Sequence, residues 1–268
     1  MHYTLHPQNR DFVWRMPAGG PSTLSAEQLR QFDEQGYLVR EDAFAVHEVA
    51  AVLAEIDPLE AAAESELRTR PNARRWISRA DEITFRPHLV LKSAALAEFC
   101  RHPVLLGLCA ALIGPDVRLY WDQCVYKKPG MAEAFPWHQD NGYTFVEPQQ
   151  YLTCWIALTD ATEANGCPWI APGLHRLGTL HHDYTELGFR CLDAAPDSMP
   201  VPLRAGSIAV FSSLTPHRTG PNLTGATRKA YIVQYAPEGA RIQRADGEHE
   251  ICAVEGRQFA VLRQGKPI

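Results

Sequence analysis

Length, composition and charge describe an ordinary globular chain. It has 268 residues, of which 46% are hydrophobic and 21% charged, and a formal net charge of −5, which suits one domain with a sizeable core. The negative balance gives no basis for expecting nucleic acid or an anionic membrane as a partner, and no stretch approaches the roughly 20 apolar residues of a membrane helix.

The first 116 residues predict a mainly helical support for the rest of the chain. Residues 1–24 are rich in Pro and Gly and lack the apolar h-region of a signal peptide, so we expect them to lie over the surface. Pro58 falls inside the second predicted helix, where it removes a hydrogen bond, and we expect a kink or an interruption there. The predicted helices are 25–36, 45–63 and 94–113, the last divided near Pro103, with a short strand at 37–39.

From residue 117 the pattern changes to short β-rich runs separated by turn residues. Strands do not alternate with helices, so a parallel doubly wound sheet is not expected. Helices first and short strands afterwards favour a sandwich or jelly roll. We predict one domain, mainly β with flanking helices, with a double-stranded β-helix (jelly roll, cupin-like) core over 117–237 and a C-terminal extension over 238–268. The β-rich runs are 117–126, 151–158, 168–171, 201–203, 207–211 and 228–235.

The seven cysteines include no C-x-x-C pair. Most of them, such as Cys124 and Cys154, stand among apolar neighbours, as buried small hydrophobic residues do. Free thiols are typical of a reducing compartment, so we expect a cytoplasmic protein. The oligomeric state is not readable from the sequence.

Several familiar catalytic motifs are absent. The chain has no G-x-S-x-G nucleophile elbow, no G-x-x-x-x-G-K-[ST] phosphate loop and no G-x-G-x-x-G dinucleotide fingerprint. His47 and Glu48 begin an H-E-x-x-H zinc-protease pattern, but position 51 is Ala. These absences exclude whole classes of enzyme.

The remaining chemical signal is histidine next to a carboxylate. His138 and Asp140 form an H-x-D pattern, and residues i and i+2 of a strand point to the same face, so both side chains can reach one metal. Two imidazole nitrogens and one carboxylate oxygen on one face of an octahedron leave three positions open for a co-substrate and O₂. The pattern alone is weak, because His181 and Asp183 repeat it, and a third ligand must come from elsewhere.

The downstream sequence separates the two patterns. His217 stands far enough beyond His138 for several strands to lie between them, and Arg228 follows on the next β-rich run. There it can point into the interior of the barrel. A buried guanidinium is costly unless an anion meets it, and its forked donors suit a carboxylate.

These residues resemble the phytanoyl-CoA dioxygenase family of Fe(II)/2-oxoglutarate-dependent oxygenases. The shared pattern is H-x-D, a strand ending C-W-I-A-L-T-D, an N-G-C-x-x-x-x-P-G-x-H loop and then H-x-[ST]-x-x-N-x-[ST]-x-x-x-R. The resemblance runs from about Ser25 to Pro237 and is densest from Trp121 onward. The matching segments are Cys154–Asp160, Asn165–Cys167, Pro172–His175 and His217–Arg228.

The resemblance implies an iron and 2-oxoglutarate site. His138, Asp140 and His217 would be the Fe(II) ligands, and they are the residues expected to carry catalysis. Arg228 would pair with the distal carboxylate of 2-oxoglutarate, and Thr219 would hydrogen-bond it. The implied reaction uses O₂ to hydroxylate an unactivated C–H bond of a small molecule while 2-oxoglutarate is decarboxylated to succinate and CO₂.

Further positions are implied by the same resemblance. Thr153 and Trp155 resemble co-substrate-contacting positions, and Gln123 is a weaker candidate of the same kind. Tyr143 lies close enough to Asp140 in sequence to face the open side of the iron and contact substrate. The carboxylate of Asp140 argues against a halogenating variant, which needs a small residue there. His181 and Asp183 are expected to be a loop pair, solvated or lining the entrance.

Two segments are candidates for covering the site. The first is a basic segment, which is either a solvated surface or a substrate lid. The second is residues 180–202, a long stretch without a clear pattern that could form another lid, since such loops are often functional. An acyl-CoA substrate is not implied. The alternative from another class is a cupin-like metal-binding jelly-roll protein without oxygenase activity, and a purely structural interaction protein is a third reading. The basic segment contains Arg74, Arg75, Trp76, Arg79 and Arg86.

Overall fold

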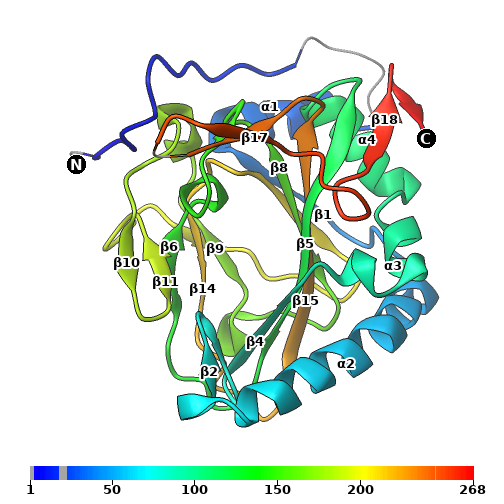
Figure 1. Cartoon of the computed structure of the whole chain (residues 1–268), viewed down its shortest axis with the longest axis vertical. Helices are drawn as coiled ribbons and strands as arrows, with labels where there is room; N and C mark the ends of the chain where they lie inside the picture. Colours follow the sequence, from blue (N-terminus) through cyan, green and yellow to red (C-terminus); the bar gives the residue numbers. More distant parts are fainter. Residues whose placement is uncertain (1–2, 18–22, 245) are drawn as a thin grey trace.

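Two antiparallel β-sheets and a layer of helices form the centre of this computed structural model, which describes residues 3–17, 23–244 and 246–268. The two sheets are those of a jelly roll. Helices cover the outer face of the larger sheet, on the right in Figure 1, and the smaller sheet lies on the left. The helices are α1 (Ala26–Gln35), α2 (Val46–Arg68), α3 (Ala94–Phe99) and α4 (Pro103–Leu112).

The larger sheet has ten strands, and its main path runs β1-β13-β8-β15-β5-β4-β3-β2. Strand β18 pairs with β5 and carries β19 beside it. Neighbouring strands along this path pair in the antiparallel direction, as expected for a jelly roll. The strands are β1 (Tyr37–Arg40), β13 (Ile208–Ser212), β8 (Leu152–Ala157), β15 (Arg228–Pro237), β5 (Val117–Lys127), β4 (Ile83–Pro87), β3 (Ser78–Arg79), β2 (Arg74–Arg75), β18 (Ala260–Arg263) and β19 (Lys266–Pro267).

The smaller sheet has the order β12-β9-β14-β6. Three further strands, β7, β16 and β17, form a separate sheet near one end of the barrel, and β10 and β11 form a hairpin. The strands are β12 (Met199–Pro200), β9 (Pro168–Ile170), β14 (His217–Thr219), β6 (Phe135–His138), β7 (Val146–Glu147), β16 (Arg241–Gln243), β17 (His249–Ile251), β10 (Asp183–Thr185) and β11 (Gly188–Arg190).

Alternation along the strands separates two cores. On β8, Cys154 and Ile156 join the core under the helices, whereas Trp155 and Ala157 join the core between the two sheets. This period of two is what places successive side chains on opposite faces of a strand. The inner face of the larger sheet therefore supplies one wall of the barrel interior.

Local sequence signals explain where the first helix begins and ends. The Ser25 side chain accepts the backbone N–H of Gln28, the Gln28 side chain accepts the N–H of Ser25, and Gly36 ends the helix in the left-handed conformation. The predictions of this helix, of the strand after it and of the division near Pro103 are confirmed.

Of the two outcomes expected at Pro58, a kink or an interruption, the interruption is wrong, because α2 runs as one helix from Val46 to Arg68. Pro58 and Ala54 are both exposed. The Ala54 carbonyl, which loses its intrahelical partner at Pro58, can therefore bond to water, so the helix continues.

Two further sequence predictions need correction. Residues 201–203 form no strand, and Leu203 makes only an isolated bridge to Ala161. The segment before residue 117 is less purely helical than expected, because β4 pairs with β5 inside the larger sheet. Short strands such as β4 and β14 carry too few residues for a clear alternating pattern, and pairing with neighbours defines them.

The N-terminal segment crosses one end of the barrel, at the top of Figure 1. Asn9 is buried there and donates to the carbonyls of Leu177 and Thr179, both at 2.9 Å. Residues 1–2 and 18–22, which belong to the predicted surface segment, lie outside the described residues. Among the described residues, none of the helices combines the length and apolar character needed to span a membrane.

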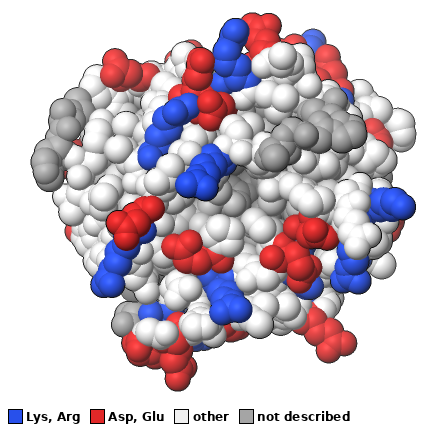
Figure 2. All heavy atoms as spheres, turned by 90° about the horizontal axis from the view of Figure 1, so that it is seen from above, with Lys and Arg blue, Asp and Glu red and all other residues white. Residues whose placement is uncertain are grey.

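Positive and negative side chains are interspersed on the face seen in Figure 2. A field of one sign is what attracts polyanions from a distance. This face carries no such field.

Candidate active site

Strands β6 and β14 bring two histidines together. His217 lies directly opposite His138 in the antiparallel β14–β6 pairing, and their ring centroids are 4.1 Å apart. The His217 Nε2 and an oxygen of Asp140 are 3.9 Å apart. The candidate ligand atoms of all three residues lie within 4.8 Å of one another, which is the separation a shared metal ion requires.

Hydrogen bonds orient each of the three side chains. His138 donates its Nδ1 proton to the Pro136 carbonyl at 2.8 Å, and His217 donates to the Thr215 carbonyl at 3.0 Å. Since a carbonyl can only accept, both Nδ1 atoms carry the proton, and both Nε2 atoms keep a free lone pair for a metal. Asp140 Oδ2 accepts the Thr153 hydroxyl at 2.5 Å.

The two candidate ligands of the H-x-D pattern do not share one strand as expected. Strand β6 ends at His138, and Asp140 opens a 3₁₀ turn, η3 (Asp140–Gly142). Gln139 between them keeps an extended backbone, with φ −108° and ψ 143°. One extended residue is enough to turn the two side chains to the same side, which explains why the pattern still brings them together.

Burial sets the charge of the triad. It lowers the pKa of His138 to about 3 and that of His217 to about 4, and it raises the pKa of Asp140. Both imidazoles are therefore neutral at neutral pH, as metal ligands must be. Two neutral imidazoles and one carboxylate suit Fe(II).

His182 is a supporting residue that the sequence did not reveal. Its Nε2 accepts the backbone N–H of Gln139 at 2.9 Å, and its Nδ1 donates to the Leu180 carbonyl at 2.9 Å. The ring packs so closely on Gly142 that any Cβ there would collide with it. His182 thereby fixes the backbone between His138 and Asp140. Its neighbours His181 and Asp183 form an exposed pair at 3.4 Å.

Arg228 is fully buried at the first position of β15. Its Nη1 donates to the Val125 carbonyl at 3.4 Å, but Nε and Nη2 have no hydrogen-bond partner within the described chain. The guanidinium lies 5.1 Å over the Trp155 ring, and burial lowers its pKa to about 10. A charged fork with unused donors in the interior is a ready partner for a carboxylate.

Lys127 lies opposite Arg228 in the pairing of β15 with β5, and its side chain reaches Thr219. The Lys127 Nζ donates to the Gly220 carbonyl at 2.5 Å and to the Thr219 hydroxyl at 3.1 Å. Thr219 Oγ1 thus accepts from the lysine and keeps its own proton for a ligand. Lys127 was not predicted as a site residue from the sequence. The available signal was its position directly before the Lys128-Pro129-Gly130 turn.

A cavity of about 150 Å³ opens beside the triad. Gln123 and Tyr143 line it together with His138 and Asp140. The Tyr143 ring stands edge-on to the His138 ring, with centroids 5.4 Å apart, and its hydroxyl accepts the Phe189 N–H at 3.3 Å. Thr153 lies behind Asp140, and its hydroxyl accepts from Gln234 at 3.2 Å.

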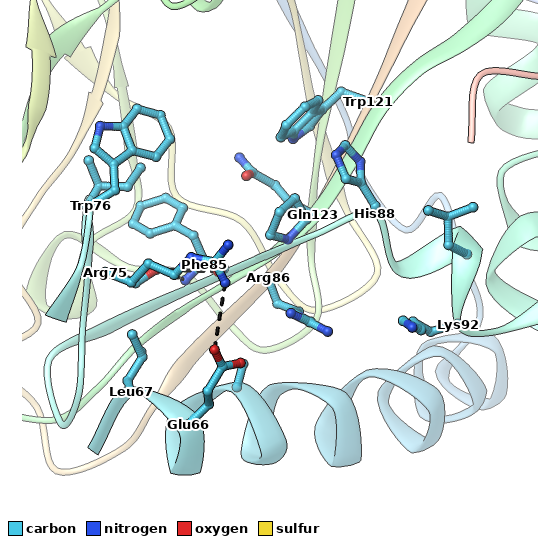
Figure 3. A pocket seen from close by; sticks show the side chains of 15 residues that line it. Glu66, Leu67, Arg75, Trp76, Phe85, Arg86, His88, Lys92, Trp121 and Gln123 are labelled. Atoms are coloured by element: carbon cyan, nitrogen blue, oxygen red, sulfur yellow. Dashed lines mark hydrogen bonds and ion pairs between the residues drawn. The ribbon is translucent and has the colours of Figure 1, made fainter. Parts of the chain in front are cut away.

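A larger outer cavity of about 410 Å³ adjoins the first one. It lies between α2, the β2–β3 hairpin and the turn η2 (Leu89–Leu91). The two cavities share four lining residues, and Figure 3 shows Gln123 lying between Trp76 and Trp121 at the opening. The shared residues are Trp76, Ile77, Trp121 and Gln123.

The two candidate lids contact each other. Arg74 donates to the backbone carbonyl of Glu186, at the tip of the β10–β11 hairpin. The Glu186 carboxylate lies 3.7 Å from both Arg74 and Arg79. The outer cavity is instead lined by Arg75, Trp76 and Arg86. One part of the basic segment therefore contacts the β10–β11 hairpin, and the other part lines the entrance.

Residues 32–230 match the model of a protein family described as Phytanoyl-CoA dioxygenase (PhyH). The methylphosphonate hydroxylase of Gimesia maris is 35% identical over 154 residues, a match that spans 57% of this chain and 56% of that protein. The chain thus aligns with little more than half the length of that relative. The ectoine dioxygenase of Bordetella parapertussis is 27% identical over 239 residues, which cover 79% of this chain and 75% of that protein.

Solved structures show the same architecture. The non-heme alpha ketoglutarate dependent carbocyclase SnoK from nogalamycin biosynthesis superimposes with a TM-score of 0.67 at 26% identity, over 93% of this chain and 96% of that chain. The apoform of EctD from S. alaskensis gives a TM-score of 0.68 at 22% identity, over 92% and 87%.

Proposed function

The chain belongs to the phytanoyl-CoA dioxygenase family, and from this premise we propose that it is an Fe(II)/2-oxoglutarate-dependent dioxygenase that hydroxylates an unactivated C–H bond of a small molecule. The relatives' names include ectoine and methylphosphonate, so a small-molecule substrate fits the family.

The unpaired guanidinium of Arg228 carries the proposal. A metal-binding jelly roll without a co-substrate, the alternative function, gains nothing from a fully buried arginine with two unused donor nitrogens. A co-substrate carboxylate would pair with both donors and neutralise the buried charge. The triad and the guanidinium then hold the two ends of one 2-oxoglutarate molecule.

In this proposal His138, Asp140 and His217 hold the iron. Arg228 and the Thr219 hydroxyl bind the distal carboxylate of 2-oxoglutarate, and the Trp155 ring supports the guanidinium. When bound, iron and 2-oxoglutarate supply an O₂-dependent C–H oxidation coupled to decarboxylation to succinate and CO₂.

The remaining residues position the reactants. Thr153 donates to the Asp140 oxygen Oδ2 and leaves Oδ1 for the metal. Tyr143 and Gln123 line the space where a substrate C–H bond would lie. The apolar and aromatic walls of that space exclude water from the reaction.

We also propose that the chain works as one domain in the cytoplasm. Strands of the larger sheet come from both ends of the described chain, from β1 to β19, which supports a single folding unit. All seven cysteines are free, as suits a reducing compartment. The small molecule is the only partner proposed; nucleic acid and membrane are not.

The test is succinate formation by the full chain from 2-oxoglutarate, with Fe(II) and O₂, across a panel of small molecules. The proposal predicts turnover that requires Fe(II) and rises with a suitable substrate. Retained iron binding without any 2-oxoglutarate binding or consumption would support the alternative instead.

A further inference from the structure

The outer cavity is the larger part of the space that leads to the triad. Its volume of about 410 Å³ compares with about 150 Å³ beside the triad. Since 2-oxoglutarate would take part of the inner space, most of a substrate's bulk has to lie in the outer cavity. The chemistry of its walls therefore indicates what kind of molecule binds.

Positive charge predominates in the outer cavity. Arg75, Arg86 and Lys92 line it, and Glu66 is the one acidic lining residue. Glu66 is already paired, with Arg70 at 2.5 Å and with Arg75 at 3.8 Å. The dashed line in Figure 3 marks the Arg75–Glu66 pair, and Arg86 and Lys92 lie apart from that pair.

Of the three cations, Arg86 is the half-buried one, whereas Arg75 and Lys92 are exposed. The Arg86 Nε is buried without a hydrogen-bond partner, and its side chain forms no ion pair within the described chain. Its positive charge acts on Glu66 and on His88, but Glu66 already pairs with two other arginines. An uncompensated, half-buried guanidinium at a cavity wall has donors to spare for an anion.

The other residues that line the outer cavity are largely aromatic. Trp76, Phe85 and Trp121 line the cavity, and His88 stands edge-on to Trp121 with ring centroids 4.3 Å apart. Burial, followed by the nearby Arg257 and Arg86, lowers the pKa of His88 to about 4, so this ring is neutral. These walls favour an apolar body.

Backbone strain marks the same walls. Trp76 has φ +50° and His88 φ +60°, a conformation that bulky residues seldom adopt. Trp76 is also 53% exposed at the cavity mouth. Such strain persists where the surrounding structure enforces it, typically at ligand-binding positions.

Resting on the proposed function, we propose that the substrate is an amphipathic anion. A phosphate monoester or a carboxylate binds Arg86, assisted by Arg75 and Lys92, and an apolar or aromatic body lies between Trp121 and Trp76. That body extends past Gln123, so that its far end presents a C–H bond beside the triad. A compact inorganic anion would leave the aromatic walls in contact with water.

The test compares three probes of one shape by calorimetric titration of the full chain. The probes are 4-phenylbutyl phosphate, 4-phenylbutyrate and the neutral 4-phenylbutanol. The proposal predicts that at least one anion binds roughly tenfold or more tightly than the alcohol, and that added salt weakens only the anions. Stronger binding of the phosphate identifies a phosphate monoester, and equal or stronger binding of the carboxylate identifies a carboxylate.

The variants assign the preference to its residue. Arg86→Met should abolish the higher affinity for the anion while leaving the affinity for the alcohol unchanged. Lys92 is exposed, so Lys92→Met should reduce the affinity for the anion only in part. Arg204→Met is the matched control, because Arg204 is an exposed arginine that pairs with Asp42 away from the cavity. Equal affinities for the three probes, or an anion preference that survives in Arg86→Met, would overturn the proposal.

The outcome is separable from that of the proposed function. Titration of the same samples with Fe(II) and 2-oxoglutarate reports on the triad and Arg228 alone. Normal 2-oxoglutarate binding with no anion preference defeats the substrate class and leaves the dioxygenase standing. An anion preference without any 2-oxoglutarate binding defeats the dioxygenase.

Discussion

His217 lies directly opposite His138 across the β14–β6 pairing, and each ring donates its Nδ1 proton to the carbonyl two residues before it. The two proposed ligands are therefore held by the same kind of hydrogen bond on neighbouring strands. Neither ring can rotate without breaking a hydrogen bond, so the two Nε2 atoms stay directed toward one point.

Replacement of either histidine should abolish Fe(II)-dependent turnover of 2-oxoglutarate. His138→Ala or His217→Ala removes one of three ligands, whereas His181→Ala changes only an exposed loop pair. Succinate formation measures the effect. Comparable losses in all three variants would contradict the assignment of the ligands.

His182→Ala should weaken iron binding by roughly 10- to 100-fold, the range known for residues that orient metal ligands. The Gln139 N–H loses its acceptor, and the turn between His138 and Asp140 loosens. Iron affinity is measured by competition with a chelator. His181→Ala is the control one residue away, and an unchanged affinity in His182→Ala would exclude this role.

Arg228→Met should have opposite effects on binding and on stability. Loss of one partner of a buried charge pair should weaken 2-oxoglutarate binding by about 30-fold or more. Without co-substrate, removal of an unpaired buried charge should raise the free energy of unfolding by about 1 kcal/mol or more. Calorimetry and denaturant unfolding measure the two quantities.

Lys229→Met is the control for Arg228→Met. Lys229 is the next residue of β15, but its side chain pairs with Asp57 at 2.8 Å on the helical side. Its replacement should leave 2-oxoglutarate affinity unchanged. Equal weakening by both variants would mean that Arg228 acts only through the stability of β15.

Gly188→Ala should be unusually costly. Gly188 has φ +119°, and a Cβ there would collide with the Tyr143 hydroxyl. We expect a loss of about 2–4 kcal/mol in the free energy of unfolding, from backbone strain and overpacking together. Gly239 has φ +81° with open space around it. Gly239→Ala should therefore lower the free energy of unfolding by the backbone strain alone.

A double variant with Tyr143→Phe isolates the contact between Gly188 and Tyr143. Tyr143→Phe removes the hydroxyl, so part of the cost of Gly188→Ala should disappear in the double variant. Additive losses in thermal unfolding would show that the two residues do not interact.

Stability should depend on pH through Asp122. Burial raises its pKa from 3.8 to about 6, so between these values the folded protein binds more protons than the unfolded chain. Its contribution to stability is therefore full below about pH 4 and lost as the pH rises through about 6. At about 1.4 kcal/mol for each pH unit, the loss amounts to roughly 3 kcal/mol.

Asp122→Asn should remove this dependence. The variant cannot ionise, so its unfolding midpoint in urea should fall less than that of the native chain between pH 4 and 7. Identical pH profiles for the two proteins would show that Asp122 does not titrate over this range.

Local signals in the sequence predicted most of the scaffold. The Ser25 capping box, Gly36 and the alternating pattern of residues 151–158 are short-range features that act through neighbouring backbone. The interruption wrongly expected at Pro58 is of a different kind, because the exposure of Ala54 depends on what packs beside α2.

Contacts between distant residues were not predictable in the same way. His182 meets Gln139 and Lys127 meets Thr219 only after the strands have paired. A histidine in a repeated H-x-D pattern and a lysine before a turn carry no signal of the groups they will face. The clustering of His138, Asp140 and His217 was predictable because the spacing of these residues in the sequence resembles that of a known family.

Anaerobic titration with Fe(II) and 2-oxoglutarate, followed by absorption spectroscopy, tests the iron and 2-oxoglutarate site most directly. We predict a metal-to-ligand charge-transfer band in or near the visible region that saturates with 2-oxoglutarate, requires His138, Asp140 and His217, and needs more 2-oxoglutarate in Arg228→Met. Absence of the band in a sample that binds both Fe(II) and 2-oxoglutarate would contradict the site.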